Sequence, residues 1–271
     1  MEFNHAIITG GSSGIGLAVA KQLAGKNYNL SLIARNKTRL ADAQNQLNKL
    51  KIDASQKIEI FPADVTNNIE IEETVESAIS NSGVPNILIT CAGAVHPGYF
   101  NDFDIEVFEQ LMAVNYLGTV YTVKAVLPHM RNNKSGHIVL VSSAAGLIGI
   151  YGYSAYSPTK FALTGFAQSL RSEIRRDNIN VSIVYPPDTD TPQFHEENKL
   201  KPPECRIITN FGGLLSAEKV ADCILKGINR TKFIITPGIK MLLLARLNNI
   251  LSPLLLRYFD YLIDKHQGSK K

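Results

Sequence analysis

Cysteine is scarce in this chain of 271 residues, and its spacing is uninformative. The three cysteines are Cys91, Cys205 and Cys223, which form no CxxC pair and leave an odd number. Neither a disulfide framework nor a zinc site has support from this pattern. We therefore expect no metal and a reducing compartment.

The sequence also lacks a surplus of charge in its body and a secretory leader. The net charge is +4, and beyond residue 239 six basic residues face two acidic ones, so the whole excess lies in the tail. A neutral body argues against nucleic-acid binding, whereas a basic tail is compatible with a membrane surface. The first strand-like run begins at His5, which leaves no room for a signal peptide. We expect a cytoplasmic protein.

Short apolar runs alternate with longer segments of helical period. The runs span residues 5–9, 29–34, 57–63, 86–90, 137–143, 179–184 and 232–236. This alternation predicts a Rossmann-like, doubly wound parallel sheet in a three-layer α/β/α arrangement, with ligands at the carboxyl ends of the strands. We expect one domain over residues 1–238 and an apolar helical extension over residues 239–271.

A glycine-rich turn, TGGSSGIG at residues 9–16, follows the first run and precedes a helical segment. Gly10, Gly14 and Gly16 would let the backbone approach a pyrophosphate, whose charge the N–H groups of a helix N-terminus would bind. The spacing is not GxGxxG, and a tight strand-to-helix connection is the plain alternative.

The turns after the next runs indicate which dinucleotide is bound. Arg35 follows the second run, where a site that prefers NAD usually has an acid, and a guanidinium suits a 2′-phosphate. We predict NADPH, although a solvated arginine is common at such a place. Asp64 could accept from the adenine amino group and residues 91–93 could pass beneath the cofactor, or both could be ordinary turns. We expect Cys91 to be a buried, inert thiol.

Four polar residues can converge at the same sheet edge. Tyr156 and Lys160 are four apart and share a helix face, Ser143 follows the fifth run, and Asn115 lies in an earlier helical segment. Reduction of a ketone requires a proton donor and hydrogen bonds to the developing alkoxide. Tyr156 would donate the proton, Lys160 would lower the pKa of Tyr156, and Ser143 would hold the carbonyl oxygen. Asn115 would anchor a water, or simply bond to backbone.

TGxxxGxG, an internal helical Asn, and Ser followed by YxxxK together resemble the short-chain dehydrogenase/reductase family over roughly residues 4–238. The resemblance implies Asn115, Ser143, Tyr156 and Lys160 as a catalytic tetrad, and often a homo-oligomer formed by residues 104–130 and 154–176. The implied cofactor contacts are Gly10, Ser12, Ser13, Gly14, Ile15, Gly16, Arg35, Lys37, Asp64, Val65, Ala92, Gly93, Tyr156, Lys160, Pro186, Thr189 and Thr191. A departure is Thr90-Cys91-Ala92-Gly93, where the family often has Asn-Asn-Ala-Gly.

YPPDTDTP at residues 185–192 and FHEENKLKPPE at residues 194–204 resemble a branch of the family that reduces a long-chain amino ketone. They would belong to a substrate lid over about residues 188–215. Asp188 or Asp190, or one of the two glutamates that follow, could pair with the substrate ammonium. Capping or tightening of turns is the alternative for both aspartates.

The tail after residue 238 is rich in Leu and Ile around a narrow polar stripe. Ser252-Pro253 predicts a helix start, and therefore two helices with a bend. Between Arg246 and Arg257 the charge-free run has only ten residues, whereas a spanning helix needs about 20. We expect the tail to lie on a membrane surface. Packing against the protein's own core or a second subunit is the alternative.

Two rival functions remain open. Another short-chain enzyme acting on a steroid, retinoid or other lipid ketone would share the tetrad and need no lid acids. A scaffold that binds NADPH without turnover would belong to a different class, and the complete tetrad argues against it.

Overall fold

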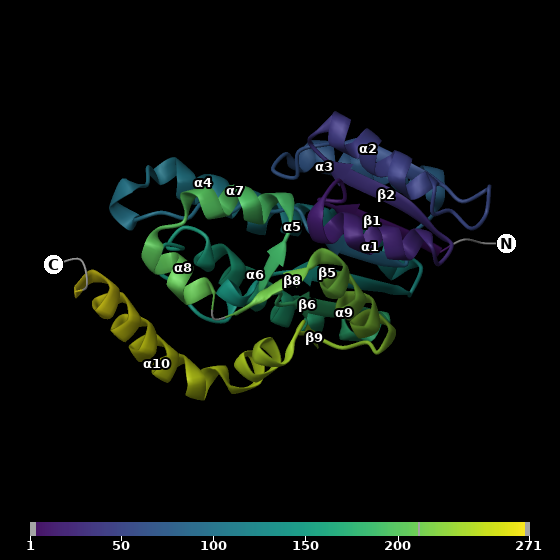
Figure 1. The fold of residues 1–271 in the computed structure, drawn as a ribbon. Helices are drawn as coiled ribbons and strands as arrows, with labels where there is room; N and C mark the ends of the chain where they lie inside the picture. The colour runs from purple at the N-terminus through teal and green to yellow at the C-terminus, as the bar shows by residue number, and fades with distance from the viewer. Residues whose placement is uncertain (1–3, 211, 269–271) are drawn as a thin grey trace.

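The computed structural model describes residues 4–210 and 212–268 (Figure 1). The strands are β1 (Asn4–Thr9), β2 (Tyr28–Ala34), β3 (Ile58–Pro62), β4 (Ile87–Thr90), β5 (Gly136–Val141), β6 (Ile179–Val184), β7 (Asp188–Asp190), β8 (Leu214–Ser216) and β9 (Ile234–Ile235). The α-helices are α1 (Gly14–Ala24), α2 (Lys37–Asn48), α3 (Asn68–Ser82), α4 (Ile105–Met112), α5 (Gly118–Asn132), α6 (Ser157–Glu173), α7 (Pro192–Leu200), α8 (Pro203–Thr209), α9 (Ala217–Asn229) and α10 (Ile239–Gly268).

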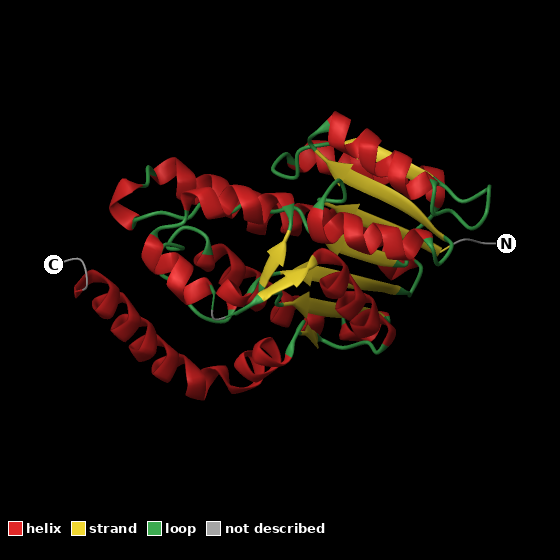
Figure 2. Cartoon of the chain, viewed as in Figure 1, coloured by secondary structure: helices red, strands yellow, loops and turns green. Residues whose placement is uncertain are grey.

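Seven strands form one parallel sheet in the order β3-β2-β1-β4-β5-β6-β9 (Figure 2). Each of the seven runs predicted from the sequence supplies one of these strands. The side chains of the five inner strands are buried almost without interruption, as in β4, because helices cover both faces of the sheet. The Rossmann-like α/β prediction is confirmed.

Two apolar clusters hold the three layers together. One cluster joins the sheet to α1, α2 and α9, through residues such as Val19, Leu40 and Ile224. The other joins the opposite face to α3, α5 and α6, through residues such as Val75 and Val126. Because the strands are parallel, their carboxyl ends meet at one edge, and the polar loops that follow them are brought together there.

The segment between β6 and α9 forms a small unit of its own beside that edge. β7 pairs in parallel with β8, from Asp188 opposite Leu214 to Asp190 opposite Ser216, and α7 and α8 lie between the two strands in the chain. The sequence analysis predicted a lid here but missed both strands, because each is only three residues long and β7 follows two prolines. We call residues 188–216 the lid.

α10 is bent, but not where the sequence predicted. The backbone leaves helical geometry at Leu247 (φ −113°, ψ 19°), and the segments Ile239–Asn248 and Ile250–Gln267 meet at 112°. Ser252-Pro253 is therefore not the break. Pro253 falls instead in the first turn of the second segment, where its missing N–H costs no helical hydrogen bond.

α10 runs back beneath the lid and packs against α8 (Figure 1). Met241, Leu244 and Phe259 are buried and belong to the same apolar cluster as α3, α5 and α6. In the described part of the chain, no helix alone has the length and apolarity to cross a membrane, although the two segments of α10 reach that threshold when taken together.

Candidate active site

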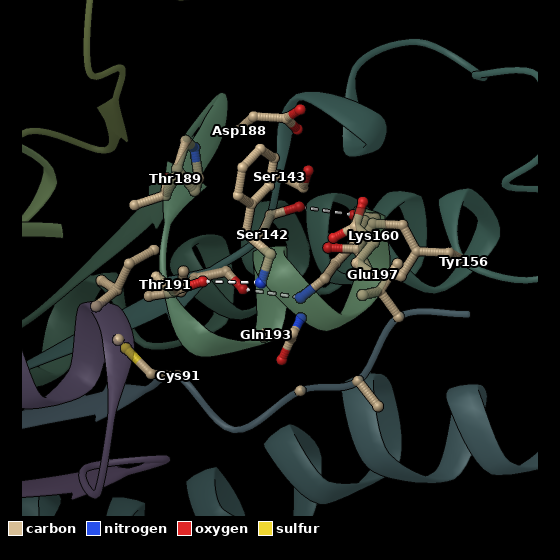
Figure 3. A pocket seen from close by; sticks show the side chains of 18 of the residues that line it. Cys91, Ser142, Ser143, Tyr156, Lys160, Asp188, Thr189, Thr191, Gln193 and Glu197 are labelled. Atoms are coloured by element: carbon tan, nitrogen blue, oxygen red, sulfur yellow. Dashed lines mark hydrogen bonds between the residues drawn. The ribbon is translucent and has the colours of Figure 1, made fainter. Parts of the chain in front are cut away.

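A cavity of about 890 Å³ lies along the carboxyl edge of the sheet. The glycine-rich turn and the ends of β2 and β3 form one end, and the ends of β4, β5 and β6 form the middle. The lid and α10 complete the walls. Figure 3 shows side chains from the β5 loop, α6 and the lid around the same hollow.

Two glycines of the glycine-rich turn, Gly10 and Gly16, lie so close to neighbouring backbone that neither has room for a Cβ. Gly10 has a positive φ of 68°, and a Cβ there would lie 2.7 Å from the Ala92 nitrogen. A Cβ on Gly16 would collide with the carbonyl oxygen of Gly10. Helix α1 begins at this turn, and Ser13 at its N-cap makes no side-chain capping bond. This cradle of backbone and helix N-terminus fits the pyrophosphate of a dinucleotide.

Arg35 lies at the end of the cavity where the adenosine ribose of such a dinucleotide would be. Its side chain is 68% exposed, and its Nη1 lies 3.7 Å from Oδ2 of Asp64. Arg39, in the first turn of α2, also lines the cavity, whereas Lys37 is not among the described residues that do. The sequence analysis therefore missed the second cation. The spacing of four residues between Arg35 and Arg39 was the signal that could have revealed this second cation.

Asp64 and Val65 both line the cavity after β3. Asp64 Oδ1 accepts from the backbone N–H and the hydroxyl of Thr66, each at 2.9 Å. Asp64 thus builds the turn that the alternative interpretation anticipated, and its contact with adenine stays a prediction.

Ser143, Tyr156 and Lys160 are brought together in the middle of the cavity (Figure 3). Ser143 forms a side-chain hydrogen bond with Tyr156. The Lys160 ammonium lies 5.6 Å from the centroid of the Tyr156 ring and donates to the Val141 carbonyl at 3.2 Å. A hydroxyl, a phenol and an ammonium therefore surround one point at the sheet edge, as ketone reduction requires.

The electrostatics of Tyr156 differ from the sequence-based expectation. Burial raises the pKa of Tyr156, Glu197 raises it further, and the hydrogen bond with Ser143 only partly opposes them. Burial also lowers the pKa of Lys160 to about 8. The predicted lowering of the Tyr156 pKa is absent because desolvation of the phenolate dominates. The phenol therefore stays protonated at neutral pH, which is the form that can donate a proton.

Asn115 is fully buried in a π-helical turn, Ala113–Leu117, between α4 and α5. Its Oδ1 accepts from the Ala94 N–H at 2.8 Å, and its Nδ2 donates to the Ala94 carbonyl at 2.9 Å and to Thr159 at 2.9 Å. These bonds to backbone match the alternative interpretation. Asn115 fixes the loop after β4, and its side chain is not among the described residues lining the cavity.

The loop after β6 closes over the glycine-rich turn. The Pro186 carbonyl accepts from the Ala144 N–H at 2.9 Å, and Thr189 and Thr191 both line the cavity. Thr191 caps α7 through Phe194 N, and its Cγ2 lies 3.1 Å from where a Cβ of Gly14 would be. The start of the lid therefore faces the predicted cofactor cradle.

The two lid aspartates have different surroundings. Asp190 pairs with His195 at 2.8 Å, and both side chains are more than half exposed. Asp188 Oδ2 lies 3.2 Å from the Lys201 ammonium, whose side chain is 1% exposed. Asp188 thus lines the cavity with the buried Lys201 behind it, and Asp190 belongs to the lid surface.

Lys201 also joins Glu197, at 2.9 Å, and Glu197 accepts a short hydrogen bond from Tyr153. The Tyr153 ring meets the Tyr156 ring edge-on, with centroids 5.3 Å apart. The sequence analysis considered Glu197 only as one of four lid acids and missed Lys201 and Tyr153. The i, i+4 spacing of Glu197 and Lys201 was the available signal.

Cys91 lines the cavity below the glycine-rich turn, and burial raises the pKa of its thiol to about 12. Such a thiol is almost entirely protonated at neutral pH and is a poor nucleophile, as expected. Among the described residues, no cluster of His, Cys, Asp and Glu has the composition of a metal site.

Comparison with known proteins agrees with this geometry. Residues 4–201 match the family described as short chain dehydrogenase. The chain is 38% identical to 3-dehydrosphinganine reductase of Danio rerio, over 92% of this chain and 75% of the relative. It is 39% identical to 3-ketodihydrosphingosine reductase of Dictyostelium discoideum, over 96% and 82% of the two chains.

Solved structures with the same fold are more distant in sequence. Levodione reductase superposes with a TM-score of 0.78 at 20% identity, over 86% of this chain and 95% of that one. A short chain dehydrogenase/reductase from Burkholderia phymatum, in complex with NAD, has a TM-score of 0.81 at 22% identity over 94% and 96%. The fold and the match over most of the sequence agree, and the chain is a member of the short-chain dehydrogenase family of oxidoreductases.

Proposed function

We propose that this protein reduces 3-ketodihydrosphingosine to dihydrosphingosine with NADPH, a step of sphingolipid synthesis. The observation that carries the proposal is one cavity that joins a dinucleotide cradle, Ser143 and Tyr156, and an apolar wall. The names of the relatives give the substrate class. A long-chain amino ketone has a polar head and an alkyl tail, and the cavity has a charged and an apolar part to match.

NADPH, when bound, supplies the hydride. The glycine-rich turn and the N-terminus of α1 would hold its pyrophosphate, since that stretch offers backbone N–H groups without side chains in front of them. Arg35 and Arg39 would bind the 2′-phosphate by charge-assisted hydrogen bonds. Thr189 and Thr191 would cover the cofactor from the lid side.

The residues around the ketone would bind its oxygen and supply one proton. Ser143 would donate a hydrogen bond to the carbonyl oxygen and hold it beside the Tyr156 hydroxyl. As negative charge develops on that oxygen, Tyr156 would transfer its proton to it. The Lys160 ammonium would stabilise the phenolate that remains. Asn115 acts at a distance by fixing Ala94, and is therefore a positioning residue.

Asp188 and Glu197 offer a place for the ammonium of the substrate. Together with Lys201 they form a buried group of two carboxylates and one ammonium, so one negative charge is left in excess. A second cation would balance it, since a buried unpaired charge is costly. Burial already raises the pKa of Asp188, which is the sign of that cost. Asp190, exposed and paired with His195, would serve the lid rather than the substrate.

α10 would place the protein on the cytosolic face of a membrane. Its outward side exposes Leu247 and Ile250, and Arg246 lies on the same segment as Leu247. Apolar side chains next to cations favour an anionic lipid surface. Flotation with phosphatidylserine vesicles tests this, because Leu247→Asp with Ile250→Asp should abolish co-flotation. A homo-oligomer formed through α4, α5 and α6 is a separate proposal. The molar mass in solution, measured by analytical sedimentation, tests it.

The decisive assay is oxidation of NADPH by 3-ketodihydrosphingosine in detergent, alongside NADH, a steroid ketone and simple ketones. We expect the amino ketone with NADPH to give the highest kcat/KM. Faster turnover of the steroid would favour the rival lipid-ketone reductase. If Tyr156→Phe abolished hydride transfer but left the biological output unchanged, the scaffold interpretation would replace catalysis.

A further inference from the structure

α10 lies outside the sheet and its helical layers, yet it supplies part of the catalytic cavity. The residues of α10 that line the same cavity as Ser143 and Tyr156 are Lys240, Met241, Leu243, Leu244, Leu251, Leu255 and Phe259. All but Lys240 are apolar. The tail is therefore continuous with the place where the ketone would react.

The bend at Leu247 is what brings both segments of α10 to this cavity. Met241 and Leu244 come from the first segment, three residues apart. Leu251, Leu255 and Phe259 come from the second, spaced by four, so they share one helix face. In a straight helix the same spacings would place these five side chains on one face, spread along about 27 Å. The bend curves that face around the cavity.

The wall opposite α10 is apolar as well. Ile148 and Ile150 follow β5, Ile208 lies on α8, and all three line the cavity. Phe259 and Ile208 also line a second hollow of about 370 Å³, together with Tyr151, Leu256 and Ile263. The two hollows therefore adjoin each other between α8 and α10, with Phe259 and Ile208 bordering both.

We infer that α10 forms the alkyl-chain subsite of the enzyme, and that Leu251, Leu255 and Phe259 set the preference for chain length. The occupant is the saturated tail of the substrate, whose ketone lies beside Tyr156. This inference rests on the proposed reduction of a long-chain ketone. Each methylene buried along the wall should raise kcat/KM about fourfold, until the chain reaches the end of the apolar wall.

Leu254 and Leu255 provide a matched pair for the test. Leu255 lines the cavity, whereas its neighbour Leu254 is 59% exposed on the other face of α10. The substrates are simple ketones without an amine, lengthened two methylenes at a time and kept below their micelle concentrations. Leu255→Gln should lower kcat/KM for the longest ketones about tenfold and leave the shortest unchanged, and Leu254→Gln should match the wild type.

A variant with a larger side chain in the subsite gives a second test. Leu255→Trp should reduce turnover only above a certain chain length, with the thermal midpoint of unfolding measured alongside. Equal losses at every chain length in both Leu255 variants would overturn the inference. An effect of Leu254→Gln alone would do so too, and would favour docking to lipid. A wild type that prefers long chains but gains nothing from an amine would contradict the proposed substrate, not the subsite.

Discussion

The buried ammonium of Lys201 lies 2.9 Å from Oε1 of Glu197, on the wall that also carries Tyr153 and Tyr156. The same ammonium lies 3.2 Å from Asp188, and it faces the Phe194 ring with 5.0 Å to the centroid. Lys201 therefore organises two carboxylates from β7 and α7 into one group beside the catalytic phenol. The lid is thus an electrostatic part of the active site as well as a cover.

Replacement of Glu197 should reveal whether this group binds an amine. Glu197→Gln removes the excess negative charge, so KM for the amino ketone should rise about tenfold, within the range of charge-assisted hydrogen bonds. The same variant should leave KM for the corresponding ketone without an amine nearly unchanged. Steady-state kinetics with both substrates checks this.

Asp190→Asn is the matched control, because Asp190 is exposed, pairs with His195 on the lid surface and is not among the described residues of the cavity wall. It should behave as the wild type with both ketones. Equal KM changes for the two substrates in Glu197→Gln would contradict amine recognition and indicate a general effect on the lid.

The pH dependence of reduction should follow Lys160. Burial lowers the pKa of Lys160 to about 8. The ammonium is present below that pH and lost above it, so kcat/KM for the ketone should fall as pH rises through about 8. Tyr156 should not cause this fall, because burial raises its pKa and keeps the phenol protonated.

Lys160→Arg keeps the charge at all accessible pH values, so any residual activity of this variant should lack the fall near pH 8. A pH profile that stays flat between about pH 7 and pH 10 in the wild type would contradict the assignment to Lys160.

Arg35 should determine the choice of cofactor. Arg35→Ala removes a guanidinium that suits a 2′-phosphate, so KM for NADPH should rise about tenfold while KM for NADH stays the same. The effect is expected to be moderate because Arg35 is largely exposed and Arg39 remains. The measurement is initial velocity against each dinucleotide.

Lys37→Ala serves as the control, since Lys37 is not among the described residues of the cavity wall. It should alter neither KM. A parallel loss of affinity for NADPH and NADH in Arg35→Ala would mean that Arg35 binds some other part of the cofactor.

The parts of the structure that sequence predicted well are those with strong local patterns. All seven strands of the main sheet were foreseen, because buried parallel strands are continuous apolar runs. Ser143, Tyr156 and Lys160 followed from their motif spacing. β7 and β8 were missed because each has only three residues and they pair with each other across more than 20 residues of chain.

Electrostatic and tertiary features were not accessible in the same way. The direction of the Tyr156 pKa shift depends on burial by the lid and on Glu197, which spacing alone does not reveal. The bend of α10 was placed at Ser252-Pro253 by local signals, whereas the helix breaks at Leu247. A proline is accommodated in the first turn of a helix, so the second segment can begin a few residues before Pro253 and the break can lie at Leu247.

Asn115 should prove more important for stability than for the chemical step. Asn115→Ala leaves both the N–H and the carbonyl of Ala94 without their side-chain partner in a partly buried place. Each unsatisfied group costs about 1–3 kcal/mol, so the free energy of unfolding should fall by about 2–6 kcal/mol. Denaturant unfolding, monitored by circular dichroism, checks this value.

The alternative role, an anchored water that links Lys160 to solvent, predicts a different result. It would leave stability almost unchanged and reduce kcat without altering cofactor binding. Gly93 directly precedes Ala94, and a Cβ built on Gly93 would lie 3.1 Å from Asn115 Oδ1 and 3.7 Å from Lys160 Nζ. Loss of the Asn115 side chain should therefore disturb Gly93 and also weaken NADPH binding. A stable Asn115→Ala variant with normal NADPH affinity and low kcat would therefore restore the water-relay interpretation.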